Sequence, residues 1–279
     1  IESLDIREVE YWKENIKAGN LYINRGTTGA IVLRQPFGGM GKSAVGAGRK
    51  AGVHNYITQF MDYDEVAKPQ VSANLNHPLM SVIKSWKSEA TKGIHAKFEL
   101  DFDRLEAALY SYVESFENEF NKEHDHFKIR GEDNIFRYLP LSKVAVRVEK
   151  DDSLFDVISR ILAAKVSGVS LHVSIEATLE TPIVSFLFEN KERLFGANDL
   201  LIRQSTEEFI EGFAKFERII YGNISRVPRE VFEAAANAVK YIVRQNPMMD
   251  GRFELLNYFQ EQSISHSYHR YGNLGARGL

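Results

Sequence analysis

The sequence predicts an α/β fold built on a parallel sheet with helices on both faces. Between residues 144 and 222, short strand-like runs rich in β-branched residues alternate with amphipathic helical runs. The strand-like runs are VAVRV, VSLHVSI, DLLIRQS and RIIYG. Strands that alternate with helices are typical of βαβ units, whose crossover helices cover a parallel sheet. We therefore expect a Rossmann-like sheet in this part of the chain.

The first crossover helix has the clearest pattern. Residues 153–168 place apolar side chains at positions i, i+3, i+4, i+7 and i+8, namely Leu154, Val157, Ile158, Ile161 and Leu162. Ser153 and Asp156 have the spacing of a capping box, and Gly168 is a typical helix end. The pattern predicts a helix with one buried face.

Further helices are expected after the later strands. TPIVSFLFENKERLFG begins with Pro182 in a first-turn position, and TEEFIEGFAKFE precedes the fourth strand. The last two helices are predicted in PREVFEAAANAVKYIVRQ and GRFELLNYFQEQ. The final run, SISHSYHRYGNLGARGL, has no helical period, so we expect it to be extended and ordered only where it docks.

The N-terminal third has a different pattern. We predict a helix over residues 5–18 and strands in NLYIN and HNYITQF, with a glycine-rich segment between the strands. A long helix is predicted over residues 101–121, followed by the polar loop NKEHDHFKIRGEDN. A polar, proline-punctuated stretch separates the two regions. The expected domains are an N-terminal segment, a linker, an α/β domain and a docking tail, at residues 1–62, 63–78, 79–262 and 263–279.

Composition excludes several classes of function. The 279 residues carry a net charge of −3, so no bulk basic field indicates a nucleic acid partner. No apolar run approaches the roughly 18 residues that span a bilayer, and the charged start is no signal peptide. These features favour a cytoplasmic protein. The absence of cysteine excludes disulfides, thiolate metal sites and a cysteine nucleophile within these residues.

The glycine-rich segment does not match a phosphate-binding loop. Gly41, Lys42 and Ser43 supply the end of a G-x-x-x-x-G-K-[ST] motif, but Pro36 stands where its first glycine would be. Two G-x-G-x-x-A matches, beginning at Gly39 and Gly46, follow no hydrophobic strand. The histidine pairs in this chain have no evident third metal ligand. We assign neither a nucleotide nor a metal to these residues.

The stretch GNLYINRGTTGAIVLRQPFGGMGKSAVGAGRKAGVHNYITQF resembles the C-terminal end of the catalytic domain of aldehyde dehydrogenases. Its N-R-G-T-T-G-A and Q-P-F-G-G steps occur together, as in the L-glutamate γ-semialdehyde dehydrogenases of proline catabolism. The final run, GRFELLNYFQEQSISHSYHRYGNLGARGL, resembles the end of long bifunctional proline-utilisation flavoproteins. The resemblance implies the C-terminal part of an enzyme that oxidises proline to glutamate with FAD and NAD.

The resemblance also implies which residues bind substrate. A family loop that matches Gly29 and Ala30 anchors the semialdehyde's amino and carboxylate groups through main-chain N–H donors, and glycine permits positive φ and close approach to an anion. Phe37 matches an aromatic residue that packs on the aldehyde's aliphatic part; core packing is the alternative. Thr28 is a secondary contact or a turn cap. Other residues are expected in turns, namely Gly38, Gly39 and Gly41, or on a solvated or parent-contacting face, namely Lys42, Arg49 and Lys50.

The family's chemistry begins with attack of a cysteine thiolate on the aldehyde, followed by hydride transfer to NAD. Because this chain has no cysteine, we expect the nucleophile and the NAD and FAD sites upstream of Ile1. The fragment alone is expected to be inactive and to bind no cofactor. The resemblance implies as partners the upstream domains of the same polypeptide, L-glutamate γ-semialdehyde and further copies of the chain. The resemblance also implies a parent that is cytoplasmic or peripheral at the inner membrane.

The α/β domain is predicted to be noncatalytic. The turn after its first strand, EKDDS, lacks glycine and carries carboxylates where a pyrophosphate would approach. The resemblance implies a cover over the passage between two active sites, with a tail that docks through Tyr268, Arg270 and Tyr271 and turns at Gly272 and Gly275. Three alternatives stay open: a stand-alone NAD-dependent semialdehyde dehydrogenase fragment, a domain that itself binds NAD, and a purely structural oligomerisation domain.

Overall fold

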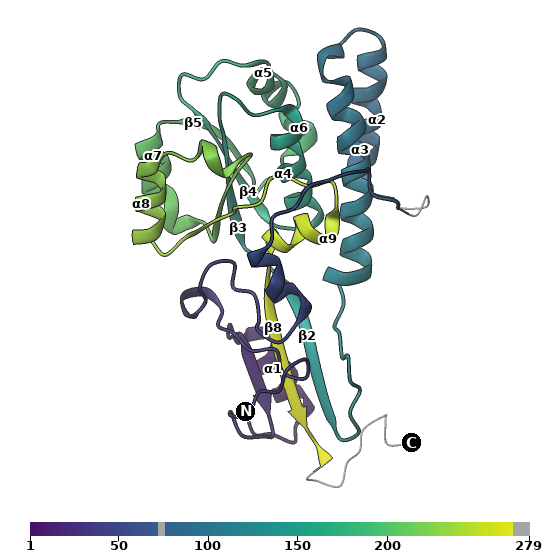
Figure 1. Ribbon diagram of the computed structural model, residues 1–279, viewed down its shortest axis with the longest axis vertical. Helices are drawn as coiled ribbons and strands as arrows, with labels where there is room; N and C mark the ends of the chain where they lie inside the picture. Colours follow the sequence, from purple (N-terminus) through teal and green to yellow (C-terminus); the bar gives the residue numbers. More distant parts are fainter. Residues whose placement is uncertain (72–75, 270–279) are drawn as a thin grey trace. The chain divides into compact units, whose positions relative to one another are not determined.

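The computed structural model describes residues 1–71 and 76–269, which form two compact units (Figure 1). The first unit combines three stretches of the chain, Ile1–Met61, Asn121–Leu139 and Gln260–Leu279. The second unit combines Asp62–Phe120 and Pro140–Phe259. The first unit is therefore assembled from segments that are far apart in the sequence. The expected domain scheme, with its linker at residues 63–78 and tail at 263–279, stays a prediction.

The second unit contains the predicted parallel sheet. Its strand order is β5-β4-β3-β6-β7, and every neighbouring pair is parallel. The strands are β3 (Lys143–Val148), β4 (Ser170–Glu176), β5 (Leu200–Gln204), β6 (Arg218–Tyr221) and β7 (Tyr241–Ile242). After β3, the chain adds β4 and β5 on one side of β3 and then crosses back to add β6 and β7 on the other side. This order confirms the predicted α/β class.

Helices cover both faces of this sheet (Figure 1). One face carries α4 (Leu154–Val166), whose N-terminus has the predicted capping box of Ser153 and Asp156. The helices that follow α4 in the chain are α5 (Pro182–Glu189), α6 (Lys191–Leu194), α7 (Thr206–Glu211) and α8 (Arg229–Asn237). Apolar side chains from α7 and α8 pack on the opposite face from α4, against Ala145 and Ile219.

Two further helices extend the second unit. α2 (Pro78–Thr91) packs on α3 (Glu99–Ser115), which in turn packs on α4. Trp86 of α2 is fully buried, and its indole N–H donates to Asn190 Oδ1 at 2.7 Å. A π-helical turn, Phe116–Phe120, continues α3. The predicted helix over residues 101–121 is confirmed, apart from that final turn and an earlier start. Among the described residues, we find no helix long and apolar enough to cross a membrane.

The first unit is a three-stranded sheet of order β1-β8-β2. Its strands are β1 (Asn20–Ile23), β2 (Glu132–Pro140) and β8 (Phe259–Ser267). β1 pairs with β8 in parallel, with Asn20 opposite Ser263, and β2 runs in the opposite direction to β8 (Figure 1). α1 (Ile6–Asn15) covers one face, where Val9 packs with Leu21, Ile23 and Ile264.

Two sequence predictions near the C-terminus are wrong. The run GRFELLNYFQEQ forms only α9 (Gly251–Glu254), one 3-10 turn and the start of β8. The predicted helix after residue 228 ends at Asn237, and Tyr241 and Ile242 instead pair with β6. Val239 has a φ of +54°, a conformation that interrupts a helix. Pairing with existing strands outweighs helical propensity at both places.

The predicted strand HNYITQF is also wrong, because residues His54–Phe60 form a 3-10 helix. Asn55 is buried there, and its amide donates to Tyr138 Oη at 2.8 Å and to Glu261 Oε1 at 2.9 Å. The Thr58 hydroxyl donates to the carbonyl of Asn55 at 2.7 Å. These side-chain contacts hold a short helical turn in place of an extended segment.

Candidate functional site

The candidate loop follows β1 and is exposed. Residues 26–33 are all exposed, and Gly29 has a φ of +83° with open space around the position of a Cβ atom. The main chain at Thr28, Gly29 and Ala30 is therefore accessible to a ligand. For residues 26–30 we find no hydrogen bond within the described part of the first unit. The loop is held at its two ends.

Phe37 lies beyond the turn that closes this loop. Its backbone forms a two-hydrogen-bond bridge with Ala51, with both N···O distances at 2.9 Å. The residue is 58% exposed, so core packing within this chain does not explain it. The structure thus places Thr28, Gly29 and Ala30 in one exposed stretch and Phe37 on a separate exposed bridge. Their roles in binding substrate stay predictions.

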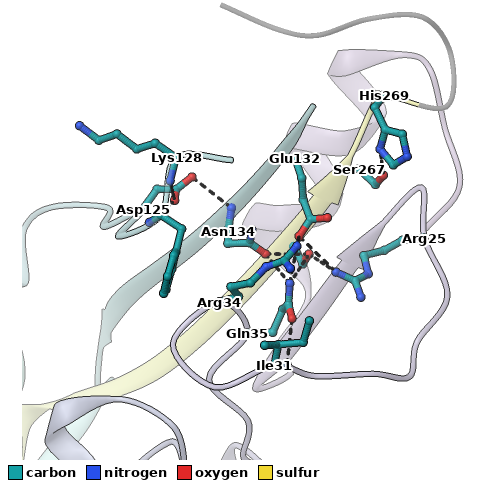
Figure 2. A network of polar contacts seen from close by, with 12 residues as sticks. Arg25, Ile31, Arg34, Gln35, Asp125, Lys128, Glu132, Asn134, Ser267 and His269 are labelled. Atoms are coloured by element: carbon teal, nitrogen blue, oxygen red, sulfur yellow. Dashed lines mark hydrogen bonds and ion pairs between the residues drawn. The ribbon is translucent and has the colours of Figure 1, made fainter. Parts of the chain in front are cut away.

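Gln35 ties the end of the loop to the sheet of the first unit (Figure 2). Its side chain is buried, and its Oε1 accepts a hydrogen bond from the backbone N–H of Ile31 at 2.9 Å. Its Nε2 lies 2.6 Å from Asn134 Oδ1 and 3.0 Å from Glu132 Oε1, both on β2. One glutamine therefore connects the loop backbone to a strand almost 100 residues away.

Glu132 contacts residues at both ends of the loop. Arg34 Nη2 donates to Glu132 Oε1 at 2.9 Å, and Arg25 Nη1 lies 3.6 Å from the same oxygen (Figure 2). Arg25 also donates to Ser265 Oγ of β8 at 2.6 Å. The side chains of all three charged residues are less than one-third exposed. Two cations around one carboxylate leave a net positive charge at the base of the loop.

The strand β8 presents a polar stripe to this region. Residues that alternate along β8 share one face, opposite to the face that carries Ile264. These residues are all buried and are Glu261, Ser263, Ser265 and Ser267. The Glu261 carboxylate accepts from the Lys50 backbone N–H at 2.6 Å and lies 3.6 Å from Arg49 Nη1. Buried polar groups need such partners, so the stripe fixes the glycine-rich segment.

Lys50 is fully buried within the first unit. Its ammonium donates to the carbonyl oxygens of Gly38 and Gly39. Burial lowers the pKa of Lys50 to about 8, against the opposing effect of Glu261. Of the two alternatives predicted for Arg49 and Lys50, the solvated face is therefore wrong, whereas Lys42 is exposed. Their burial could not be predicted from the sequence, because their partners are a carboxylate on the distant strand β8 and backbone carbonyl groups.

Gly19 is required by this close packing. A Cβ atom at Gly19 would lie 2.0 Å from the carbonyl oxygen of Gly38. The residue therefore lets the chain before β1 approach the glycine-rich segment. Gly39 is similarly constrained, since its Cβ would lie 1.9 Å from the Ser43 carbonyl oxygen. Gly41 has a φ of +57°, as a turn residue would.

The parallel sheet of the second unit has its topological switch point between β3 and β6, where such folds bind ligands. Here Arg226 contacts Asp152 and also Asp156 Oδ2, the latter at 2.9 Å. A Cβ atom at Gly222 would lie 2.5 Å from Asp152 Oδ1, so the turn after β6 is packed tightly on these groups. Burial raises the pKa of Asp152, and hydrogen bonds to Glu149 N–H and Arg226 oppose that shift.

Arg147 adds a second internal ion cluster at this edge of the sheet. Its buried guanidinium donates to Ser174 Oγ at 2.6 Å and contacts the Glu176 carboxylate. Burial raises the pKa of Glu149, which lies 3.6 Å from Arg147 Nε. Two carboxylates of the EKDDS turn, Glu149 and Asp152, are thus partnered within the chain, whereas Asp151 is exposed. These residues do not fit the pyrophosphate of a dinucleotide, which needs N–H donors and space.

Among residues 1–71 and 76–269, no group of three or more potential ligands is arranged to hold a metal ion. The predicted tail contacts are only partly within this range. The Tyr268 hydroxyl donates to Asp133 Oδ1 at 3.0 Å, and its backbone N–H donates to the Gly131 carbonyl. Arg270, Tyr271, Gly272 and Gly275 lie outside the described residues.

The N-terminal residues of the chain, including the glycine-rich segment, are similar to a known protein family. Residues 1–66 match the Aldehyde dehydrogenase family. We call residues 1–66 the aldehyde dehydrogenase-like segment. The aldehyde dehydrogenase-like segment comprises α1, β1, the candidate loop and the glycine-rich segment, and it ends just beyond the 3-10 helix His54–Phe60.

Two curated relatives are similar to part of the chain. The bifunctional protein PutA of Rhizobium meliloti is 43% identical over 84 residues, which are 30% of this chain and 6% of that protein. A 1-pyrroline-5-carboxylate dehydrogenase of Bacillus thuringiensis is 49% identical over 53 residues, which are 19% of this chain and 10% of the relative.

A solved structure extends the likeness to nearly the whole chain. The structure of Proline Utilization A from Corynebacterium freiburgense has a TM-score of 0.66 and 32% identity. It covers 97% of this chain, and the chain covers 22% of it. The chain therefore spans less than a quarter of each of these three relatives. The likeness to this structure therefore includes both the aldehyde dehydrogenase-like segment and the parallel sheet.

Lys50 generates a prediction about pH. The pKa of its amine is about 8 in the folded chain and higher when unfolded, so the unfolded state binds more protons between these values. The contribution of Lys50 to stability is therefore least favourable below pH 8 and improves as the pH rises toward the unfolded value. We expect Lys50→Met to remove this rise in the free energy of unfolding, measured by denaturant unfolding between pH 7 and 10. Lys42→Met, at an exposed lysine, should keep the wild-type pH profile; equal profiles for all three proteins would contradict the assignment.

Proposed function

We propose that the chain is the C-terminal part of a bifunctional proline-catabolic enzyme, in which residues 1–62 supply one wall of the semialdehyde site. The support is the aldehyde dehydrogenase match over residues 1–66 together with relatives named PutA and 1-pyrroline-5-carboxylate dehydrogenase. The exposed main chain at Gly29 is the observation that carries the substrate assignment. The expected substrate is L-glutamate γ-semialdehyde, the open form of 1-pyrroline-5-carboxylate.

The chemistry of this wall is recognition. The α-carboxylate of the substrate accepts hydrogen bonds from backbone N–H groups near Thr28, Gly29 and Ala30, where no competing intramolecular acceptor is described. The net positive charge around Glu132 favours an anion at the same loop. Phe37 offers an exposed ring to the aliphatic part of the aldehyde. These groups bind and orient the aldehyde toward a thiolate from another part of the polypeptide.

The second unit, in this proposal, is a noncatalytic cover or assembly domain. Its sheet has the topology of a nucleotide-binding domain, but fold alone does not determine function. The pairing of Arg226 with Asp152 and Asp156 occupies the switch point with the chain's own charges. NAD, which accepts the hydride in aldehyde oxidation, and FAD are expected to bind elsewhere in the longer polypeptide.

Replacing Gly29 tests the substrate assignment. In the longer polypeptide, Gly29→Ala strains a backbone with a φ of +83° and moves the N–H donors. We expect the KM for the semialdehyde to rise about tenfold, the loss of roughly one good hydrogen bond, with the KM for NAD unchanged. The matched control is Gly26→Ala in the same loop, where an added Cβ meets nothing within 4 Å. Equal KM values for both variants and the wild type would contradict the proposal.

Calorimetric titration tests the role of the second unit. NAD added to the 279-residue chain should give no saturable heat, because carboxylates and Arg226 take the place of pyrophosphate donors. Binding that disappears in an Asp152→Ala variant would instead identify the second unit as a nucleotide-binding domain. A solved aldehyde dehydrogenase that binds NAD serves as the positive control for the measurement.

A further inference from the structure

Both ends of the candidate loop converge on one carboxylate from a distant strand. Arg25 precedes the loop and Arg34 follows it, and both guanidinium groups contact Glu132 Oε1 (Figure 2). Gln35 Nε2 reaches the same oxygen at 3.0 Å while Gln35 Oε1 holds the Ile31 N–H. Between these anchors, residues 26–30 have no described hydrogen bond of their own. Glu132 is therefore one group that contacts both ends of the loop.

The supports of Glu132 are themselves fixed. Glu132 begins β2, two residues before Asn134, whose Oδ1 accepts from Gln35 Nε2 at 2.6 Å and from Ser265 Oγ at 3.1 Å. Ser265 lies on β8, which also pairs with β1. The loop, β2 and β8 thus form one closed hydrogen-bonded circuit within the first unit. A shift of Glu132 is transmitted to both arginines at once.

We propose that Glu132 is a positioning residue that sets the geometry of the substrate loop and hence the preference for an aldehyde that carries an α-amino acid group. The inference rests on the proposed function of the Gly29 loop. Glu132 itself does not contact the substrate in this account. It acts through Arg25, Arg34 and Gln35, which hold the backbone N–H donors at the spacing that an α-carboxylate requires.

The two physical effects of Glu132 have opposite signs, and this makes the proposal testable. Neutralising the carboxylate leaves two positive charges near the loop, which by Coulomb attraction alone would lower the KM for an anionic substrate. Loss of the two ion pairs frees the arginines and disorders the loop, which would raise that KM. The proposal requires the second effect to dominate.

The experiment uses Glu132→Gln in the longer polypeptide, assayed with L-glutamate γ-semialdehyde and with butanal, which lacks the α-amino acid group. We expect the KM for the semialdehyde to rise about tenfold with little change in kcat, as for loss of one charge-assisted hydrogen bond. The kcat/KM for butanal should stay within about twofold of the wild type, because butanal does not use these N–H groups.

The matched control is Glu123→Gln, which neutralises a carboxylate nine residues earlier that contacts Arg137 instead of the loop. A second variant, Arg34→Lys, keeps the positive charge but shortens the side chain that reaches Glu132. It serves as the test if Glu132→Gln does not fold, and it should also raise the KM for the semialdehyde. A lowered KM in Glu132→Gln, or equal losses on both aldehydes, would overturn the proposal. If Gly29→Ala raises the KM and Glu132→Gln does not, only the positioning role fails; if neither does, the proposed function fails.

Discussion

The burial of a polar strand face is the constraint on which the first unit depends. Glu261, Ser263 and Ser265 lie on one face of β8, and each is at most 2% exposed. A buried carboxylate without partners is strongly destabilising, so the segment that covers this face has to supply donors. It does so through the Lys50 N–H, the Asn55 amide and the Arg25 guanidinium. The glycine-rich segment thus takes its conformation from β8 as much as from its own sequence.

The same constraint explains why a loop with few contacts of its own has a defined shape. Residues 26–30 are exposed, while the residues on either side are bound to β2 and β8. Such a division suits a binding loop, because the donors stay open to a ligand while the ends are held by a rigid sheet. The second unit shows the opposite arrangement. There the Arg226 and Arg147 clusters satisfy the polar groups at the edge of the sheet internally.

Much of the second unit was predictable from the sequence, because its signals are local. The capping box of Ser153 and Asp156 and the alternation of strands and helices both lie within short windows.

The first unit was less predictable. Its central pairing joins residues 20–23 to residues 263–266. The predicted polar loop, residues 121–134, extends into the first three residues of β2, and no strand is predicted for the rest of β2. The alternation of Glu261, Ser263, Ser265 and Ser267 is a strand-period signal, but a buried polar face has no hydrophobic pattern to reveal it. The substrate-binding role of the candidate loop is predicted only by resemblance, and its contact with Glu132 has no sequence signal.

Hydrogen exchange tests most directly whether the buried polar face of β8 organises the loop. The measurement compares the longer polypeptide with its Glu261→Ala variant and follows the peptides that contain residues 31–37 and 49–51. The account predicts that exchange accelerates in both peptides, because the Lys50 N–H loses its acceptor and the covering segment loosens as a whole. Faster exchange confined to residues 49–51, with the loop peptide unchanged, would contradict it.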